Sequence, residues 1–123
     1  MTPLSNEFGI TVAFLHKKML IDLSGKYVLG LVVGNCVFGN QADPIGKIFN
    51  NILRDTNGSI VAKLEPENKT KLTVDETMLM NATWELLMKV KTHVCPWIPE
   101  MHTWSERSLT EVLMASDKVL EMA

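Results

Sequence analysis

The sequence predicts a single α+β domain in which an antiparallel sheet from an N-terminal β-meander packs against two or three helices. Apolar residues alternate with polar ones in the first third of the chain, as in strands with one buried face. Helically spaced apolar residues follow Pro44 and Ser108, as in helices that pack on a sheet. The chain has 123 residues and shows no repeat or linker, so residues 1–123 are expected to form one domain.

The composition narrows the possible partners and compartments. Hydrophobic residues make up 46% of the chain and charged residues 21%, as in folded proteins. The net charge is −2 and the basic residues are scattered, which argues against a nucleic-acid partner. No apolar run approaches the ~18 residues that cross a bilayer, and the N-terminus lacks signal-peptide features. We therefore expect no membrane contact and a cytoplasmic location.

Strands are predicted in order along the N-terminal third. Alternation over residues 8–15 predicts the first strand, and a short second strand is expected over residues 19–23. Residues 27–33 form an almost continuous run of β-formers. Gly34 and Asn35 both tolerate positive φ, so they predict a hairpin that joins this run to a strand over Cys36–Phe38.

A helix is predicted over residues 44–54. Asp43 suits its N-cap, and Pro44 suits its first position, where the missing N–H is not needed. One helical stripe would consist of Ile45, Ile48, Phe49, Ile52 and Leu53. Alternation over Ile60–Leu64 then predicts another strand.

After residue 72 the spacing of apolar residues predicts helices, in one segment with an alternative. Thr73 and Glu76 have capping-box spacing, which favours a helix over residues 74–83. Residues 84–94 match both a helical stripe and a strand alternation, so either structure is compatible with them. A last helix is predicted from Ser108, which has capping-box spacing with Glu111.

No set of residues has the spacing of a catalytic or metal site. None of His16, His93 and His102 has a partner at the spacing of a helical metal site. Cys36 and Cys95 belong to no CxxC pair, and we expect both to be reduced and buried unless the fold brings them within disulfide distance. An enzyme that uses Cys95 as a nucleophile would need a base that the sequence does not specify. No catalytic residue, metal or cofactor is therefore predicted.

The segment over residues 95–104 is the candidate partner-binding surface. It holds Trp97, Met101, His102 and Trp104 among prolines that exclude regular structure. Such side chains on a constrained loop are typical of interface hot spots. The alternative is a loop whose aromatic residues pack on the core.

Residues 25–39, GKYVLGLVVGNCVFG, and the helix expected after Pro44 resemble the front half of some small bacterial immunity proteins. Those proteins neutralise polymorphic or contact-dependent toxins. The likeness covers residues 25–54 and transfers no site residues. It implies a function by binding to a toxin domain, without chemistry on a substrate.

Two functional hypotheses follow from these observations. The first is a non-catalytic protein-binding module of the immunity kind, whose partner is a protein such as a toxin domain. The alternative is a small-ligand-binding or oligomeric subunit protein, in which the sheet and the helix after Pro44 form a pocket or a dimer interface.

Overall fold

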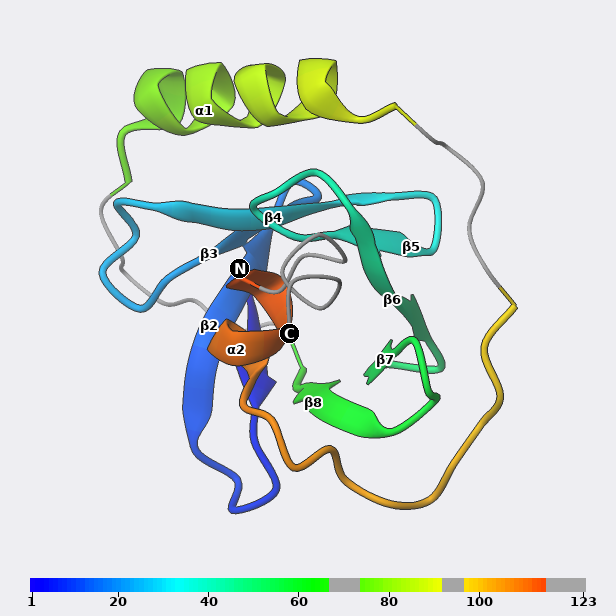
Figure 1. The fold of residues 1–123 in the computed structure, drawn as a ribbon. Coiled ribbons are helices and arrows are strands. Elements are labelled where there is room, and N and C mark those ends of the chain that lie inside the picture. Colours follow the sequence, from blue (N-terminus) through cyan, green and yellow to red (C-terminus); the bar gives the residue numbers. More distant parts are fainter. Residues whose placement is uncertain (67–73, 92–96, 115–123) are drawn as a thin grey trace.

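The computed structural model describes residues 1–66, 74–91 and 97–114. It shows a closed barrel of eight antiparallel strands in chain order, in which β1 also pairs with β8 (Figure 1). The strands are β1 (Thr2–Ser5), β2 (Thr11–His16), β3 (Met19–Ile21), β4 (Val28–Val33), β5 (Cys36–Phe38), β6 (Pro44–Phe49), β7 (Ile52–Asp55) and β8 (Ile60–Leu64). The helices are α1 (Glu76–Lys89) and α2 (Leu109–Met114). The predicted α+β fold, a sheet packed against two or three helices, is therefore wrong.

The helix predicted over residues 44–54 is the main error. This segment forms β6 and β7, in which Ile48 pairs with Leu53 and Phe49 with Ile52. Asn50 and Asn51 make the turn, with φ values of 53° and 61°. Asn tolerates this left-handed conformation, and two such residues in a row are typical of a tight hairpin. The chain reversal at this turn brings together apolar residues whose linear spacing imitates a helical stripe.

Several other predictions are confirmed with shifted boundaries. The Gly34-Asn35 hairpin is present, with Val33 paired to Cys36. The strands expected over residues 27–33, Cys36–Phe38 and Ile60–Leu64 correspond to β4, β5 and β8. The strand predicted over residues 8–15 is β2, which starts only at Thr11 because residues 6–10 form a loop, and β1 (Thr2–Ser5) was not predicted.

The helix predictions after residue 73 are confirmed in part. The N-cap of α1 is Asp75, which accepts a hydrogen bond from the Met78 amide at 3.1 Å, whereas Thr73, the residue of the predicted capping box, lies outside the described residues. Because α1 continues to Lys89, the first half of residues 84–94 is helical. Ser108 accepts a hydrogen bond from the Glu111 amide at 3.3 Å, as the capping box before α2 predicts.

Four similar two-stranded units build the barrel, a repeat that the sequence analysis missed. In each unit an aliphatic residue pairs across the strands with Ala or Gly, and a β-bulge follows. The pairs are Leu4 with Ala13, Leu20 with Gly30, Val37 with Gly46, and Leu53 with Ala62. A Cβ atom on Gly46 would lie 2.1 Å from the Arg54 carbonyl oxygen. The small residues therefore allow the strands to approach closely around the aliphatic side chains.

The loops of the four units share one hydrogen bond. In each loop the N–H of a residue with positive φ donates to the carbonyl three residues earlier, at 3.0 Å. The donor and acceptor residues are Gly9 and Asn6, Gly25 and Asp22, Ala42 and Gly39, and Gly58 and Asp55. Since the strands are antiparallel and sequential, all four loops lie at one end of the barrel, which we call the long-loop end.

Helix α2 fills the barrel from the long-loop end. Its residues Leu109, Val112 and Leu113 are buried in one cluster with the aliphatic residues of the four units. The Leu113 carbonyl accepts a hydrogen bond from the Asn40 amide at 2.9 Å. The interior of the barrel is thus a packed core.

Helix α1 lies across the outside of the barrel, over β4 (Figure 1). Leu86 and Val90 pack on Leu31, Cys36 and Phe38. Leu79 packs in a separate cluster on β2 and β3. The helix therefore covers an apolar outer face of the sheet.

Candidate functional site

Residues 97–108, which we call the strap, run along β7 and β8 and lead into α2 (Figure 1). Two backbone hydrogen bonds join Ile60 of β8 to the strap. The Ile60 carbonyl accepts one from the Ser105 amide at 2.7 Å, and the Ile60 amide donates one to the Thr103 carbonyl at 2.8 Å. Trp104 consequently forms a parallel bridge with Ile60. The strap is an extension of the sheet rather than a free loop.

A buried arginine adds a second attachment for the strap. Arg54 is 5% exposed, and its Nη1 donates hydrogen bonds to the carbonyls of Gly58, at 2.9 Å, and Met101. Its guanidinium also lies 5.5 Å from the centroid of the Phe49 ring. A buried cation requires such partners, because it has lost its hydration. Arg54 therefore joins β7, the β7–β8 loop and the strap.

The four predicted partner-binding residues all lie on the strap, but the structure does not bring them together. Trp97 is 83% exposed and lines a hollow with Phe49 and Pro99. Met101 and His102 are exposed, whereas Trp104 is half-buried at the other end of the strap. Ile98, next to Trp97, is the buried side chain of the strap. The alternative, in which the aromatic residues of this segment pack on the core, is therefore wrong for Trp97.

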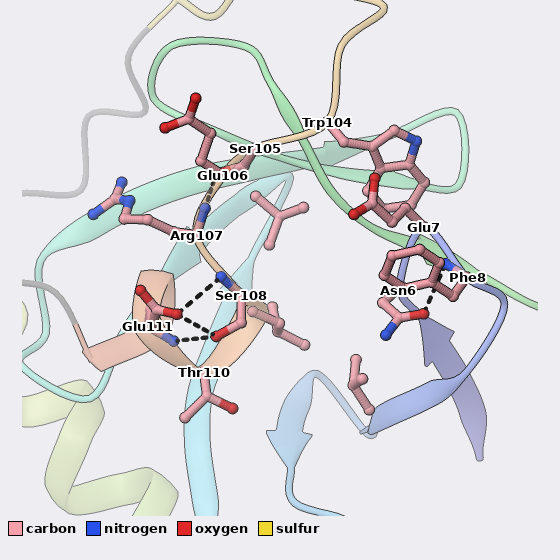
Figure 2. A pocket seen from close by; sticks show the side chains of 13 residues that line it. Asn6, Glu7, Phe8, Trp104, Ser105, Glu106, Arg107, Ser108, Thr110 and Glu111 are labelled. Atoms are coloured by element: carbon pink, nitrogen blue, oxygen red, sulfur yellow. Dashed lines mark hydrogen bonds between the residues drawn. The ribbon is translucent and has the colours of Figure 1, made fainter.

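Trp104 instead lines a cleft of about 240 Å³ at the long-loop end, which we call the mouth cleft (Figure 2). Asn6, Glu7, Phe8 and Trp104 lie along one side of it, and Arg107, Ser108 and Glu111 lie along the other. Val12, Val61 and Leu109 also line it. The cleft thus combines an apolar lining from the barrel and α2 with polar walls.

The aromatic side of the mouth cleft is held in place by neighbouring groups. The Asn6 side-chain oxygen accepts hydrogen bonds from the amides of Phe8, at 2.9 Å, and Ile10, at 3.0 Å. These bonds fix the loop that presents Phe8, although the Phe8 side chain itself is 77% exposed. The ammonium group of Lys63 lies 5.7 Å from the centroid of the Trp104 ring. Both rings are therefore presented by ordered backbone.

The charges of the mouth cleft are mainly negative. Three carboxylates line it, Glu7, Glu106 and Glu111, against one guanidinium, Arg107. Glu111 takes part in the cap of α2, because it accepts hydrogen bonds from the Ser108 hydroxyl at 3.2 Å and the Ser108 amide at 3.5 Å. Glu7 and Glu106 are exposed and face solvent. Because the Lys63 ammonium already lies beside the Trp104 ring and Glu111 is bound in the cap, the carboxylate that is open to a cationic group on the aromatic side of the cleft is Glu7.

Outside the cleft, one contact between titratable side chains holds α1 on the barrel. The His16 ring lies 2.7 Å from the Glu76 carboxylate, which connects β2 to the start of α1. This hydrogen bond and the nearby charges of His16 and Lys17 lower the pKa of Glu76 below its usual 4.5. Over residues 1–66, 74–91 and 97–114, no three His, Cys, Asp or Glu side chains gather as metal ligands. His93 and Cys95, and with them the thiol hypothesis and the Cys36–Cys95 pairing, lie outside the described residues.

Phe8 is the site residue that the sequence analysis placed wrongly, since it was expected inside a strand. A signal for its loop was present in the sequence. Asn6-x-x-Gly9 has the same form as Asp22-x-x-Gly25 and Asp55-x-x-Gly58, and Asn or Asp followed by Gly is typical of a turn. A comparison of these three segments would have predicted a loop at residues 6–10.

Comparisons of the chain with protein-family models, curated protein sequences and solved structures find no match. Within the part of the chain that the structure describes, no helix is long and apolar enough to cross a membrane.

Proposed function

We propose that this protein is a non-catalytic protein-binding module that contacts its partner through the mouth cleft. The observation that carries the proposal is the exposure of Phe8, 77%, on a loop that Asn6 fixes beside Trp104. An exposed aromatic side chain on ordered backbone loses little conformational entropy when it binds. Large aromatic side chains of this kind dominate the affinity of protein interfaces.

The charges beside Phe8 favour a cationic partner. Glu7 is exposed beside Phe8, Glu106 is exposed across the cleft, and the chain as a whole carries a net charge of −2 (Figure 2). Carboxylates near an aromatic contact accelerate association with a basic surface and disfavour acidic partners. The partner is therefore a protein whose contact surface presents Lys or Arg next to an apolar side chain.

We further propose that this partner is a toxin domain, which the protein neutralises in the bacterial cytoplasm as immunity proteins do. A toxin that acts on nucleic acid exposes a basic surface for the phosphate backbone, which matches the charge of the mouth cleft. The resemblance to immunity proteins covers residues 25–54. Only its hairpin part, residues 25–39, still supports this partner, because residues 44–54 form β6 and β7 and not the helix that completed the pattern. The protein would act by covering the toxin's substrate site, so it needs no catalytic groups of its own.

Co-expression with the adjacent gene tests this function. We expect the gene of this protein to lie directly downstream of a larger toxin gene, and its product to restore the growth of cells that express the toxin domain. Phe8→Ala should weaken this protection because it removes the exposed anchor. Tyr27→Ala is the matched control, since Tyr27 is 66% exposed beside the corresponding loop of the second unit and does not line the cleft.

The results of this experiment show whether the protein protects by binding and whether it binds through the mouth cleft. Protection that is lost with Phe8→Ala and kept with Tyr27→Ala supports the proposal. An adjacent gene product that is harmless and does not bind the purified protein contradicts it. If a double variant with Phe8→Ala and Trp104→Ala still gave full protection, the mouth cleft would not be the contact surface.

A further inference from the structure

Glu7 is the carboxylate on the aromatic side of the mouth cleft, where it lies with Phe8 and Trp104 (Figure 2). Over residues 1–66, 74–91 and 97–114, its side chain takes part in no hydrogen bond and no ion pair. Glu111 is bound in the cap of α2, and Glu106 lies across the cleft. Glu7 is therefore an exposed carboxylate, next to an exposed ring, that is open to one cationic group.

We propose that the mouth cleft binds one arginine side chain of the partner, whose guanidinium pairs with Glu7 and stacks on Phe8. This assignment rests on the proposed function, because the arginine belongs to the proposed partner. A guanidinium is planar, so its edge can donate two parallel N–H bonds to a carboxylate while its face stacks on a ring. Phe8 follows Glu7 directly and is 77% exposed, on a loop that two hydrogen bonds to the Asn6 side chain fix.

The volume of the mouth cleft matches one long side chain. The cleft measures about 240 Å³. A cavity of ~150 Å³ holds a benzene molecule, and pockets for drug-sized ligands measure ~300–1,000 Å³. The cleft lies between these two sizes, so it is too small for a helix or a drug-sized ligand. Its occupant is therefore a single side chain that the partner's surface extends into it.

The lining of the cleft favours arginine over lysine. Val12, Val61 and Leu109 provide apolar surface on which the methylene groups of the stem can pack. A guanidinium is more weakly hydrated than an ammonium group, so it enters apolar surroundings at a lower desolvation cost. It also stacks flat on an aromatic face, where an ammonium group offers only its charge.

Two cations of the chain itself limit the site to one arginine. The Lys63 ammonium lies 5.7 Å from the centroid of the Trp104 ring, and Arg107 lines the opposite side of the cleft (Figure 2). Neither of them forms an ion pair with Glu7. Phe8 is therefore the free ring of the cleft, and Glu7 is the free carboxylate beside it.

A titration of the full-length protein with small probes tests this assignment. The probes are the N-acetyl amides of arginine, lysine and citrulline, and citrulline has the shape of arginine without its charge. In nuclear magnetic resonance spectra, we expect the arginine probe to shift the amide signals of Glu7 and Phe8. The lysine probe should shift them less, and the citrulline probe should leave them unchanged.

Substitution of single carboxylates identifies the group that pairs with the probe. Glu7→Gln should weaken the binding of the arginine probe by about threefold, as for an exposed ion pair. Glu106→Gln is the matched control and should keep the affinity, since Glu106 is an exposed carboxylate across the same cleft. Equal affinity of Glu7→Gln and wild type would overturn the assignment. So would equal shifts with the arginine and citrulline probes, or unchanged Glu7 and Phe8 signals up to the solubility of the arginine probe.

The co-expression assay separates this assignment from the proposed function. Protection that is lost with Phe8→Ala but kept in full with Glu7→Gln contradicts the arginine and leaves the proposed function in place. Lack of any partner in that assay contradicts the proposed function, whereas the probe titration still decides whether the cleft binds arginine.

Discussion

Arg54 donates a hydrogen bond to the carbonyl of Met101, 47 residues later in the chain. This contact joins the barrel to the strap, which contributes Trp104, Arg107 and Ser108 to the lining of the mouth cleft. Arg54 is buried and also donates to the carbonyl of Gly58 at 2.9 Å. The position of Trp104 therefore depends on a side chain of β7 that lies outside the cleft.

Replacement of Arg54 tests this attachment. Arg54→Met keeps much of the side-chain volume but leaves the carbonyls of Gly58 and Met101 without their donor, so we expect a loss of ~2–4 kcal/mol in the free energy of unfolding. Urea denaturation measures it. Lys47→Met is the control, because Lys47 pairs with Arg54 on the neighbouring strand and is half-buried. Equal stability of the two variants would contradict the role given to Arg54.

The close approach of strands at Gly46 gives a second prediction. A Cβ atom there would lie 2.1 Å from the backbone oxygen of Arg54, so Gly46→Ala must shift a strand. We expect a destabilisation of ~1–3 kcal/mol, as for an overpacked core. Thermal unfolding of Gly46→Ala beside wild type measures it. A melting temperature of Gly46→Ala equal to that of wild type would refute the close approach.

The insertion of α2 into the barrel gives a third prediction. Leu113 is fully buried, whereas Met114 next to it is 51% exposed. Leu113→Ala leaves a cavity at the long-loop end and should cost ~2–5 kcal/mol of unfolding free energy. Met114→Ala should change it by less than ~0.5 kcal/mol, as at other surface positions. Similar unfolding midpoints for the two variants would mean that α2 does not fill the barrel.

The contact between His16 and Glu76 gives a pH dependence. The pKa of Glu76 is lower in the folded protein than its usual 4.5, because the His16 ring forms a hydrogen bond with the carboxylate. A lowered folded-state pKa stabilises the protein above the unfolded-state pKa, and this stabilisation is lost as the pH falls through the folded-state pKa. Glu76→Gln should therefore lose stability relative to wild type at neutral pH and approach it in acid.

Unfolding curves at a series of pH values measure this difference. Glu85→Gln is the control on the same helix, since Glu85 is exposed. We expect its difference from wild type to change less between neutral and acid pH. A difference for Glu76→Gln that stays constant down to acid pH would contradict the assigned contact.

The sequence predicts local turns and caps better than the overall fold. The Gly34-Asn35 hairpin and the Ser108 cap depend on neighbouring residues, so their signals are complete within a few positions. The helix predicted over residues 44–54 failed because the spacing of its apolar residues fits a helix as well as the two strands of a hairpin. The positive φ values of Asn50 and Asn51 decide between them, and Asn at both positions was the available signal.

The repeat and the site depend on contacts that are distant in sequence. The third unit has Gly39 and Ala42 where two others have Asp and Gly, which conceals the repeat. The exposure of Trp97, Met101 and His102 agrees with the expected surface segment, but the hypothesis of one cluster with Trp104 does not. Phe8 lines the same cleft as Trp104 only because the strap pairs with Ile60 beside the long-loop end. The order of residues within either segment contains no information about the pairing of the strap with Ile60.

The most direct test of the proposed function is to map the binding surface by nuclear magnetic resonance. Isotope-labelled protein is titrated with the inactivated domain encoded by the adjacent gene. We expect the amide signals of residues 6–10 and 104–111 to shift or broaden together, and those of the loop at residues 22–27 to stay unchanged. A spectrum that stays unchanged at saturating domain, or changes confined to other parts of the barrel, would contradict it.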